Sequence, residues 1–171
     1  MAQQSSSETA VQDGAAVAEP GRGEQENGVG VHLVLLSEGR VLLGQRLNTT
    51  YAEGKYHLPA GHVEAVPGES LAACARREAD EELGIGIDRD ALELVHVHHS
   101  HDLDDGRNRV QVFFRVRSWT GRIRTAEPDK CAGWEWHPLD DLPEPIVDYT
   151  AQALGAIRRG TAYSEDGWST P

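Results

Sequence analysis

The amino-acid sequence predicts a single α+β domain, and three features of the chain lead to that prediction. Its 171 residues are enough to bury one sizeable hydrophobic core, and this length is usual for one domain. An aliphatic, β-branched run that begins after Gly28 is typical of a buried strand. Residues 69–83 contain neither Gly nor Pro and are followed by Gly84, which is typical of a helix and its C-terminal end.

Further elements are predicted from the hydrophobic pattern of the chain. Strands are expected over residues 29–36, 41–43, 55–64, 92–99 and 110–116, with a short strand around residues 134–136 and a closing helix over residues 146–159. Pro59 and Gly61 interrupt the third of these strands. Polar turns at residues 37–40 and 102–108 should join neighbouring strands into two hairpins.

The limits of the domain follow from composition. Residues 1–27 are rich in Ser, Gln, Ala, Gly and Glu and poor in large aliphatic side chains, so a disordered N-terminal tail is expected. A docking arm for a partner is the alternative, but no motif in the segment supports it. The ordered domain is therefore expected over residues 28–160, and residues 161–171 are expected to form a C-terminal tail.

Charge and cysteine content argue against several classes of protein. Acidic residues outnumber basic ones by 28 to 16, giving a formal net charge of −12, so no broad basic surface for nucleic acid is expected. A small phosphorylated substrate remains compatible, because bound metal and a few local Arg or Lys side chains can carry its charge. Cys74 and Cys131 lie far apart without CxxC spacing, so both are expected to be reduced and structural.

Targeting and membrane segments are also not apparent in the sequence. No stretch is apolar for long enough to span a bilayer, and the N-terminus lacks the basic and apolar parts of a secretion signal. A cytoplasmic protein without a membrane partner is therefore expected. The oligomeric state is left open, with a homodimer as one option.

The predicted helix at residues 69–83 carries a cluster of acidic residues. Glu78, Glu81 and Glu82 stand at positions i, i+3 and i+4, so their carboxylates share one face, while Asp80 points away from them. Like charges at this spacing destabilise an isolated helix by about 0.2–0.5 kcal/mol per pair unless a cation lies among them. Oxygen donors without Cys or His favour Mg²⁺ or Mn²⁺ over zinc. The alternative is a solvated acidic face, which is common on surface helices.

Residues 61–85 resemble the signature of the Nudix family, Gx5Ex7REUxEExGU, in which U is a bulky aliphatic residue. From Glu69 onward the spacing agrees without a gap: Arg77-Glu78, then Ala79, Asp80, Glu81-Glu82, Leu83, Gly84 and Ile85. Two departures occur. Ala79 stands at a U position, and the segment between Gly61 and Glu69 is two residues longer than in the family, which makes Ala65-Val66 the insertion.

The resemblance extends beyond the signature to roughly residues 29–145. Residues 41–46 resemble the strand that commonly precedes the signature, and residues 136–143 resemble a common closing element. Membership of this family implies the Nudix α/β/α sandwich, with a mixed β-sheet between helices. It also implies a Mg²⁺-dependent pyrophosphohydrolase, with Mn²⁺ as a possible substitute.

The resemblance also implies roles for individual residues. Glu78, Glu81 and Glu82 are expected to be catalytic metal ligands, with the backbone of Gly61 as a further ligand. Arg77 and Glu69 are expected to be catalytic residues that form an ion pair orienting the loop and the helix; the alternative is a surface salt bridge worth about 0–1 kcal/mol. For the general base, the candidates are Glu82 and Glu78 on the helix and, in later segments, Glu127 and Glu135.

Candidate substrate-binding residues lie outside the helix; they are Arg46, His57, Trp136 and Glu127. Trp134 and Trp136 share one face of their strand and either cover a base, worth about 1–3 kcal/mol, or pack in the core. On the strand at residues 92–99 and just after it, alternation pairs His96 with His98 and His99 with His101. Such pairs could bind a transition metal, pack on the strand, or contact substrate phosphate.

The sequence therefore predicts a hydrolase that cleaves a diphosphate linkage in a nucleoside triphosphate or a nucleoside diphosphate derivative. Two alternatives remain: a non-catalytic nucleotide-sensing Nudix module, and a hydrolase or isomerase of a prenyl diphosphate. The presence of all three carboxylates favours catalysis. The sequence does not identify the substrate, because side chains from several loops would select it.

Overall fold

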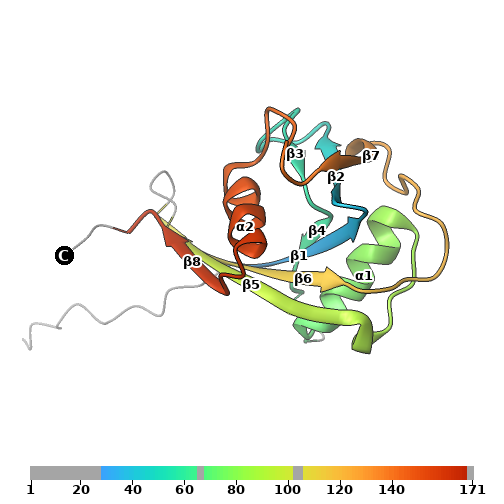
Figure 1. Ribbon diagram of the computed structural model, residues 1–171, viewed down its shortest axis with the longest axis horizontal. Coiled ribbons are helices and arrows are strands. Elements are labelled where there is room, and N and C mark those ends of the chain that lie inside the picture. Colours follow the sequence, from blue (N-terminus) through green and yellow to red (C-terminus); the bar gives the residue numbers. More distant parts are fainter. Residues whose placement is uncertain (1–27, 65–67, 102–105, 169–171) are drawn as a thin grey trace, which may run out of the picture.

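A computed structural model describes residues 28–64, 68–101 and 106–168 of the chain (Figure 1). In chain order its elements are β1 (Gly28–Ser37), β2 (Arg40–Arg46), β3 (Tyr56–His57), β4 (Ala60–His62), α1 (Leu71–Leu83), a 3₁₀ turn (Arg89–Ala91), β5 (Leu92–His101), β6 (Asn108–Val116), β7 (Cys131–Pro138), α2 (Asp148–Arg158) and β8 (Tyr163–Asp166). The expected N-terminal tail and the Ala65-Val66 insertion lie outside the described residues.

The strands form one mixed sheet in the order β3-β2-β1-β6-β5-β8, with β4 pairing β1 and β7 pairing β2. Strand β1 is central: it runs parallel to β6 from Gly28 to Leu35 and antiparallel to β4 on its other side. The two expected hairpins, β1 with β2 and β5 with β6, are both antiparallel pairs. The α+β class and the mixed sheet predicted from the sequence are therefore confirmed.

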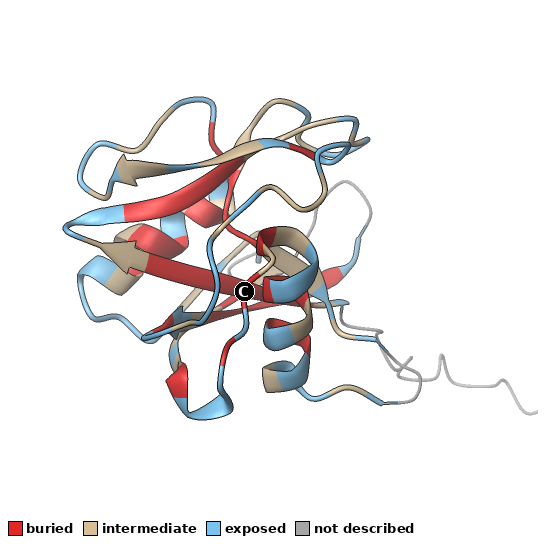
Figure 2. Cartoon of the chain, turned by 90° about the vertical axis from the view of Figure 1, so that its right-hand side faces the viewer, coloured by how far each residue is buried: buried red, intermediate tan, exposed pale blue. Residues whose placement is uncertain are grey.

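The two helices cover opposite faces of the sheet, as Figure 1 shows. Alternation along β2 sends Leu42 into the core beneath α1, and Val41 and Leu43 into the core beneath α2. Helix α1 contributes small residues such as Ala75 and Ala79, which allow close approach to the sheet. Figure 2 shows the buried strands between the two helical layers. This arrangement is the predicted sandwich.

Helix α1 begins two residues later than the sequence predicted, and capping explains why. Ser70 has an extended backbone, and its hydroxyl accepts a hydrogen bond from the Ala73 N–H at 3.2 Å, so the helix starts at Leu71. Glu69 precedes the cap and its N–H is bonded to the carbonyl of Glu64 at 3.2 Å. At the other end Gly84 adopts the expected left-handed conformation, with φ of 65°.

The C-terminal region differs from the sequence prediction in two places. Helix α2 starts at Asp148 rather than at residue 146, because the segment before it pairs with β3: Tyr56 donates to the Pro145 carbonyl at 2.8 Å and Val147 donates to Tyr56 at 3.0 Å. Residues 161–171 were expected to be a tail, but Tyr163–Asp166 form β8, which runs parallel to β5. Side-chain bonds between β5 and β8, described below, hold this strand to the sheet.

Two further expectations concern membranes and cysteines. Within residues 28–64, 68–101 and 106–168, no helix is long and apolar enough to cross a membrane. Cys74 and Cys131 are both buried and not disulfide-bonded, as expected.

Candidate active site

Arg77 ties helix α1 to the loop that precedes it. Its Nε and Nη2 donate to the two oxygens of Glu69 at 2.9 and 3.0 Å, and Nη2 also donates to the His62 carbonyl at 3.1 Å. Glu69 in turn accepts from the Glu64 N–H at 3.1 Å. The hydrogen bonds from Arg77 hold the pKa of Glu69 down at about 2. The ion pair expected from the sequence is therefore present and connects loop and helix.

The three carboxylates of α1 have different surroundings. Glu78 is buried and Glu81 is exposed. Burial raises the pKa of Glu78, and it raises the pKa of Glu82 to about 8. Arg77 donates to Glu78 at 2.6 Å and to Glu81 at 3.0 Å, while Glu82 accepts the Ala60 N–H at 2.9 Å. Glu82 is therefore the desolvated carboxylate that Arg77 does not neutralise.

A fourth carboxylate, Glu127, comes from the long loop between β6 and β7. Two backbone bonds dock this loop on the end of α1: Ala126 donates to the Glu82 carbonyl and Arg124 to the Leu83 carbonyl, each at 3.0 Å. The charge of Glu127 consequently adds to the raised pKa values of Glu78 and Glu82. Lys130, which is bonded to Glu127 at 2.7 Å, partly offsets this charge.

Of the two later acidic candidates, only Glu127 lies with the helix. Strand β7 pairs with β2 so that Glu135 lies opposite Leu43, whose side chain faces the α2 side of the sheet. The Glu135 side chain is 76% exposed and lies 3.9 Å from His137. Glu135 is thus on the face of the sheet away from α1, and it is no longer a candidate base.

Gly61 allows the backbone of β4 to lie directly against the carboxylate cluster, by which we mean Glu78, Glu81, Glu82 and Glu127. A Cβ atom at this position would collide with the carboxylate of Glu78, so only glycine lets β4 approach so closely. The neighbouring Ala60 N–H bonds to Glu82, as described above. Strand β4 and helix α1 therefore meet at the site, in spite of the longer loop between them.

The donor chemistry of this cluster fits a hard divalent cation. Within the described ranges, no three acidic, His or Cys side chains are already grouped as a metal site, and Arg77 is paired with two of the carboxylates, Glu78 and Glu81. The available donors are nevertheless carboxylate oxygens, and burial, together with the neighbouring carboxylates, raises the pKa values of Glu78 and Glu82, which a bound cation would lower again. The residues that would hold the ion are Glu78, Glu81 and Glu82 with the backbone at Gly61, as expected from the sequence, together with Glu127.

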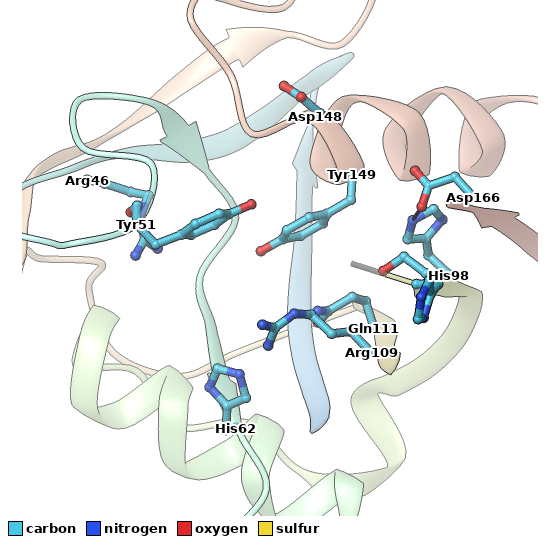
Figure 3. A pocket seen from close by; sticks show the side chains of 11 residues that line it. Arg46, Tyr51, His62, His98, Arg109, Gln111, Asp148, Tyr149 and Asp166 are labelled. Atoms are coloured by element: carbon cyan, nitrogen blue, oxygen red, sulfur yellow. Dashed lines mark hydrogen bonds and ion pairs between the residues drawn. The ribbon is translucent and has the colours of Figure 1, made fainter. Parts of the chain in front are cut away.

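A cavity of about 600 Å³ is lined by the side chains drawn in Figure 3. His62 connects this cavity to the carboxylates of α1, since its side chain lines the cavity while its carbonyl accepts a hydrogen bond from Arg77. The other lining residues are Arg46, Tyr51, His98, Ser100, His101, Arg109, Gln111, Asp148, Tyr149 and Asp166. Figure 3 shows Arg46 and Tyr51 at one end, His98 and Asp166 at the other, and Tyr149 between them.

The four expected substrate-binding residues lie in three different places in the fold: the cavity, the carboxylate cluster and the core. Arg46 lines the cavity, where its Nε donates to the Tyr51 carbonyl at 3.0 Å, and Glu127 lies at the carboxylate cluster. His57 and Trp136 do not line the cavity. His57 is buried against Trp134 with ring centroids 5.2 Å apart, and burial lowers its pKa to about 4. Trp136 packs against the core beneath α1, as does Trp134.

The histidines of β5 also separate. His96 and His98 are buried and share the hydroxyl of Ser164, whereas His99 and His101 contact the ring of Trp168 at 4.7 and 5.4 Å. His98 and His101 line the cavity. In the part of the chain that the structure describes, none of them belongs to a group of three metal-binding side chains.

Sequence reasoning missed several cavity residues, notably Tyr51, Arg109, Gln111, Tyr149 and Asp166. They come from a loop, β6, α2 and β8, so no short motif contains them. The one local signal was composition: tyrosine and arginine are common in binding sites, but each of these residues also has ordinary surface roles.

Comparison with known proteins agrees with the fold. A family model of the NUDIX domain matches residues 25–156. The chain is 28% identical over 136 residues to an RNA pyrophosphohydrolase of Erythrobacter litoralis (strain HTCC2594), covering 70% of this chain and 80% of the relative.

Solved structures of Nudix hydrolases are also similar to this chain. A MutT NUDIX hydrolase from Burkholderia pseudomallei is 31% identical, with a TM-score of 0.68, covering 77% of this chain and 98% of that chain. A NUDIX hydrolase from Nitrosomonas europaea is 21% identical and shares the fold, with a TM-score of 0.62, covering 85% and 98%.

Fold, site and relatives together define a hydrolase that acts on pyrophosphate bonds. The chain belongs to the Nudix family. Enzymes of this family generally use divalent metal cations and act on small phosphorylated substrates.

Proposed function

We propose that this chain is a Mg²⁺-dependent pyrophosphohydrolase that cleaves a nucleoside triphosphate or a nucleoside diphosphate derivative. A single observation supports the proposal: Glu78 and Glu127 lie close enough to Glu82 to raise its pKa, and strand β4 places these carboxylates next to a cavity lined by aromatic and arginine side chains. Strand β4 connects the two, with Gly61 against Glu78 and His62 in the cavity wall. A diphosphate can thus reach the carboxylates while its organic group occupies the cavity.

The carboxylate cluster supplies the chemistry. A bound divalent cation would neutralise phosphate oxygens and lower the pKa of a water molecule. Glu82 is the candidate proton acceptor, because the Ala60 N–H orients its carboxylate, Arg77 does not occupy it, and a cation bound beside it would favour its ionised form. Glu78, Glu81, Glu82 and Glu127 contribute negative charge for the cation. The bidentate Arg77–Glu69 pair holds the loop in a fixed position against the helix.

The cavity supplies the binding of the organic group. Its volume of about 600 Å³ falls within the range of 300–1,000 Å³ that is usual for small-molecule sites. Arg46 and Arg109 are suited to phosphate oxygens, and the rings of Tyr51 and Tyr149 are suited to stacking on a base. This combination favours a nucleotide over a prenyl diphosphate, which carries no aromatic base.

A second candidate substrate is the 5′-triphosphate end of RNA. The name of the Erythrobacter relative supports it. The net charge of −12 disfavours sustained binding of a long polyanion, so a mononucleotide remains the preferred candidate.

The direct test is a hydrolysis panel with Mg²⁺ or Mn²⁺ and product identification by phosphorus NMR. The panel contains nucleoside triphosphates, dinucleoside polyphosphates, nucleotide sugars, prenyl diphosphates and a 5′-triphosphorylated RNA. We expect a mononucleotide or nucleotide derivative to have the highest kcat/KM and activity to vanish with a chelator. Exclusive turnover of the prenyl compounds would refute the nucleotide assignment, and binding without any turnover would indicate a sensing module.

A further inference from the structure

A chain of buried hydrogen bonds connects β5 to β8 at one end of the cavity. His96 Nδ1 lies 2.8 Å from the Thr161 carbonyl oxygen, and His96 Nε2 lies 2.8 Å from the Ser164 hydroxyl. His98 Nδ1 lies at the same distance, 2.8 Å, from that same hydroxyl. Both imidazoles are almost fully buried, with exposed fractions of 1% and 0%.

The direction of each hydrogen bond follows from the first one. A carbonyl only accepts, so His96 Nδ1 carries the hydrogen. When the His96 ring carries only this one hydrogen, Nε2 is its acceptor, and the Ser164 hydroxyl donates to it. The single hydrogen of Ser164 is thereby used, so its oxygen accepts from the Nδ1–H of His98. Neutral His98 is left with a bare lone pair on Nε2.

That lone pair faces the carboxylate of Asp166. The distance from His98 Nε2 to Asp166 Oδ1 is 3.6 Å, longer than a hydrogen bond, and Nε2 has no hydrogen-bond partner among the described residues. Burial keeps the pKa of His98 below its ordinary value, against the opposing effect of Asp166, and so favours the neutral ring. Two hydrogen-bond acceptors, His98 Nε2 and the Asp166 carboxylate, therefore face each other, and neutral His98 does not offset the charge of Asp166.

Asp166 is at the same time accessible from the cavity. Its side chain is 43% exposed and lines the cavity at the end away from Arg46 (Figure 3). Alternation along β8 sets this direction, because Ser164 and Asp166 both face His98 of β5 while Glu165 between them is exposed. The carboxylate of Asp166, which receives no hydrogen bond from His98, therefore lies where the organic group of a bound substrate would end.

On the basis of the proposed function, we propose that Asp166 is a specificity-determining residue that accepts a hydrogen bond from an N–H group of the substrate's nucleobase. His96, Ser164 and His98 are its positioning residues, since their hydrogen-bond chain keeps a proton off the nitrogen that faces Asp166. Strand β8 lies beyond the residues that the family model matches, 25–156. The preferred substrates are bases with an amino group rather than analogues without it.

The test compares nucleotides that differ by one amino group. The pairs are adenosine with purine riboside, guanosine with inosine, and cytidine with its 4-deamino analogue, each as the monophosphate for calorimetric binding and as the triphosphate for turnover. We expect the wild-type protein to bind the amino-bearing member of at least one pair about tenfold more tightly, as for a hydrogen bond to a charged group. In Asp166→Ala this preference should fall below about twofold.

Glu165→Ala is the matched control, because it removes a neighbouring exposed carboxylate from the same strand; it should keep the wild-type preference. Equal affinity within all three pairs, no binding of any monophosphate, or a preference that survives in Asp166→Ala would overturn the assignment. Selective binding without hydrolysis would instead refute the proposed activity alone, and hydrolysis without selectivity would refute the role of Asp166 alone.

Nitrogen-15 NMR of labelled histidine tests the positioning chain directly. In the free protein at neutral pH, His98 should be protonated on Nδ1 and not on Nε2. In Ser164→Ala, which lacks the acceptor for that proton, the other tautomer should become populated and the base preference should weaken. A proton on Nε2 of His98 in the wild-type protein would overturn the proposed chain.

Discussion

The carboxylate cluster and the cavity are neighbouring regions that are built in different ways. Apart from Glu127, every charged residue of the cluster lies within residues 69–82, on one helix and the residue before its cap. The cavity wall instead uses residues from β2 to β8, more than a hundred positions apart. The chemistry of this protein is thus carried by a short segment, whereas its selectivity depends on the whole fold.

The largest expected effect is that of Glu82→Gln. The substitution keeps the shape of the side chain but removes the charge or proton acceptor, so kcat should fall at least about a hundredfold. Steady-state kinetics on the best substrate of the panel measures this, and KM should change little.

Asp80→Asn is the control for that experiment. It removes an exposed carboxylate from the same helix, and Asp80 makes no contact with the cluster, so kcat should stay within about twofold of wild type. Equal losses in both variants would show that total charge on α1, rather than the position of Glu82, determines activity.

Gly61→Ala should have the next largest effect. The added methyl group collides with the flexible end of Glu78 and not with backbone, so the carboxylate must move while the fold survives. We expect kcat to fall about tenfold to a hundredfold, because a misplacement of about 1 Å can have that effect. Gly28→Ala, whose Cβ would meet only Arg109 at 3.9 Å, is the control, and thermal melts of both variants show whether stability is involved.

The different construction of the two regions explains what the sequence could predict. Glu78, Glu81 and Glu82 follow helical spacing, and Arg77 reaches Glu69 along the same helix, so local periodicity was sufficient. Their unequal burial was not predictable, because it depends on β4 and on the loop that carries Glu127. Periodicity places side chains on a face, but it does not show what covers that face.

The fold shows the same limit. The strands of the central sheet were predictable because their side chains are buried on both faces and read as aliphatic runs. Strand β8 was missed because it is short and polar, and side-chain bonds from Ser164 to His96 and His98 hold it to β5. His57 and Trp136 were plausible ligand contacts by residue type, but the pairing of β2 with β3 and β7 places them outside the cavity.

Tyr149→Ala tests whether the cavity acts in binding rather than in chemistry. Loss of a stacking ring is worth about 1–3 kcal/mol, so KM should rise about tenfold while kcat stays near the wild-type value. Tyr149→Phe keeps the ring and should keep most of the affinity. A fall in kcat without a change in KM would contradict the division between cavity and cluster.

The buried histidines predict a smaller effect on stability. Burial lowers the pKa of His32 and of His57 from 6.5 to about 4, so the unfolded state binds more protons between these pH values. The contribution of these two histidines to stability should therefore be constant above pH 6.5 and fall as the pH drops towards 4, by about 1 kcal/mol per pH unit for each histidine, whereas the raised pKa of Glu82 makes stability fall as the pH rises towards 8. Denaturant titrations at several pH values should show a shallower slope in His57→Gln, and an unchanged slope would contradict neutral burial.

The smallest expected effect comes from the cap of the catalytic helix, Ser70→Ala. The hydroxyl of Ser70 accepts a hydrogen bond from the Ala73 N–H at the start of α1. Loss of such a cap lowers the free energy of unfolding by about 1 kcal/mol, which corresponds to about 2–4 °C in Tm for a protein of this size. Because Arg77 and Glu69 still join the loop to the helix, kcat at a temperature well below Tm should be unchanged. Ser70→Asn preserves an acceptor and should restore Tm. A large loss of kcat in Ser70→Ala alone would mean that the cap, and not the ion pair, holds the carboxylates in place.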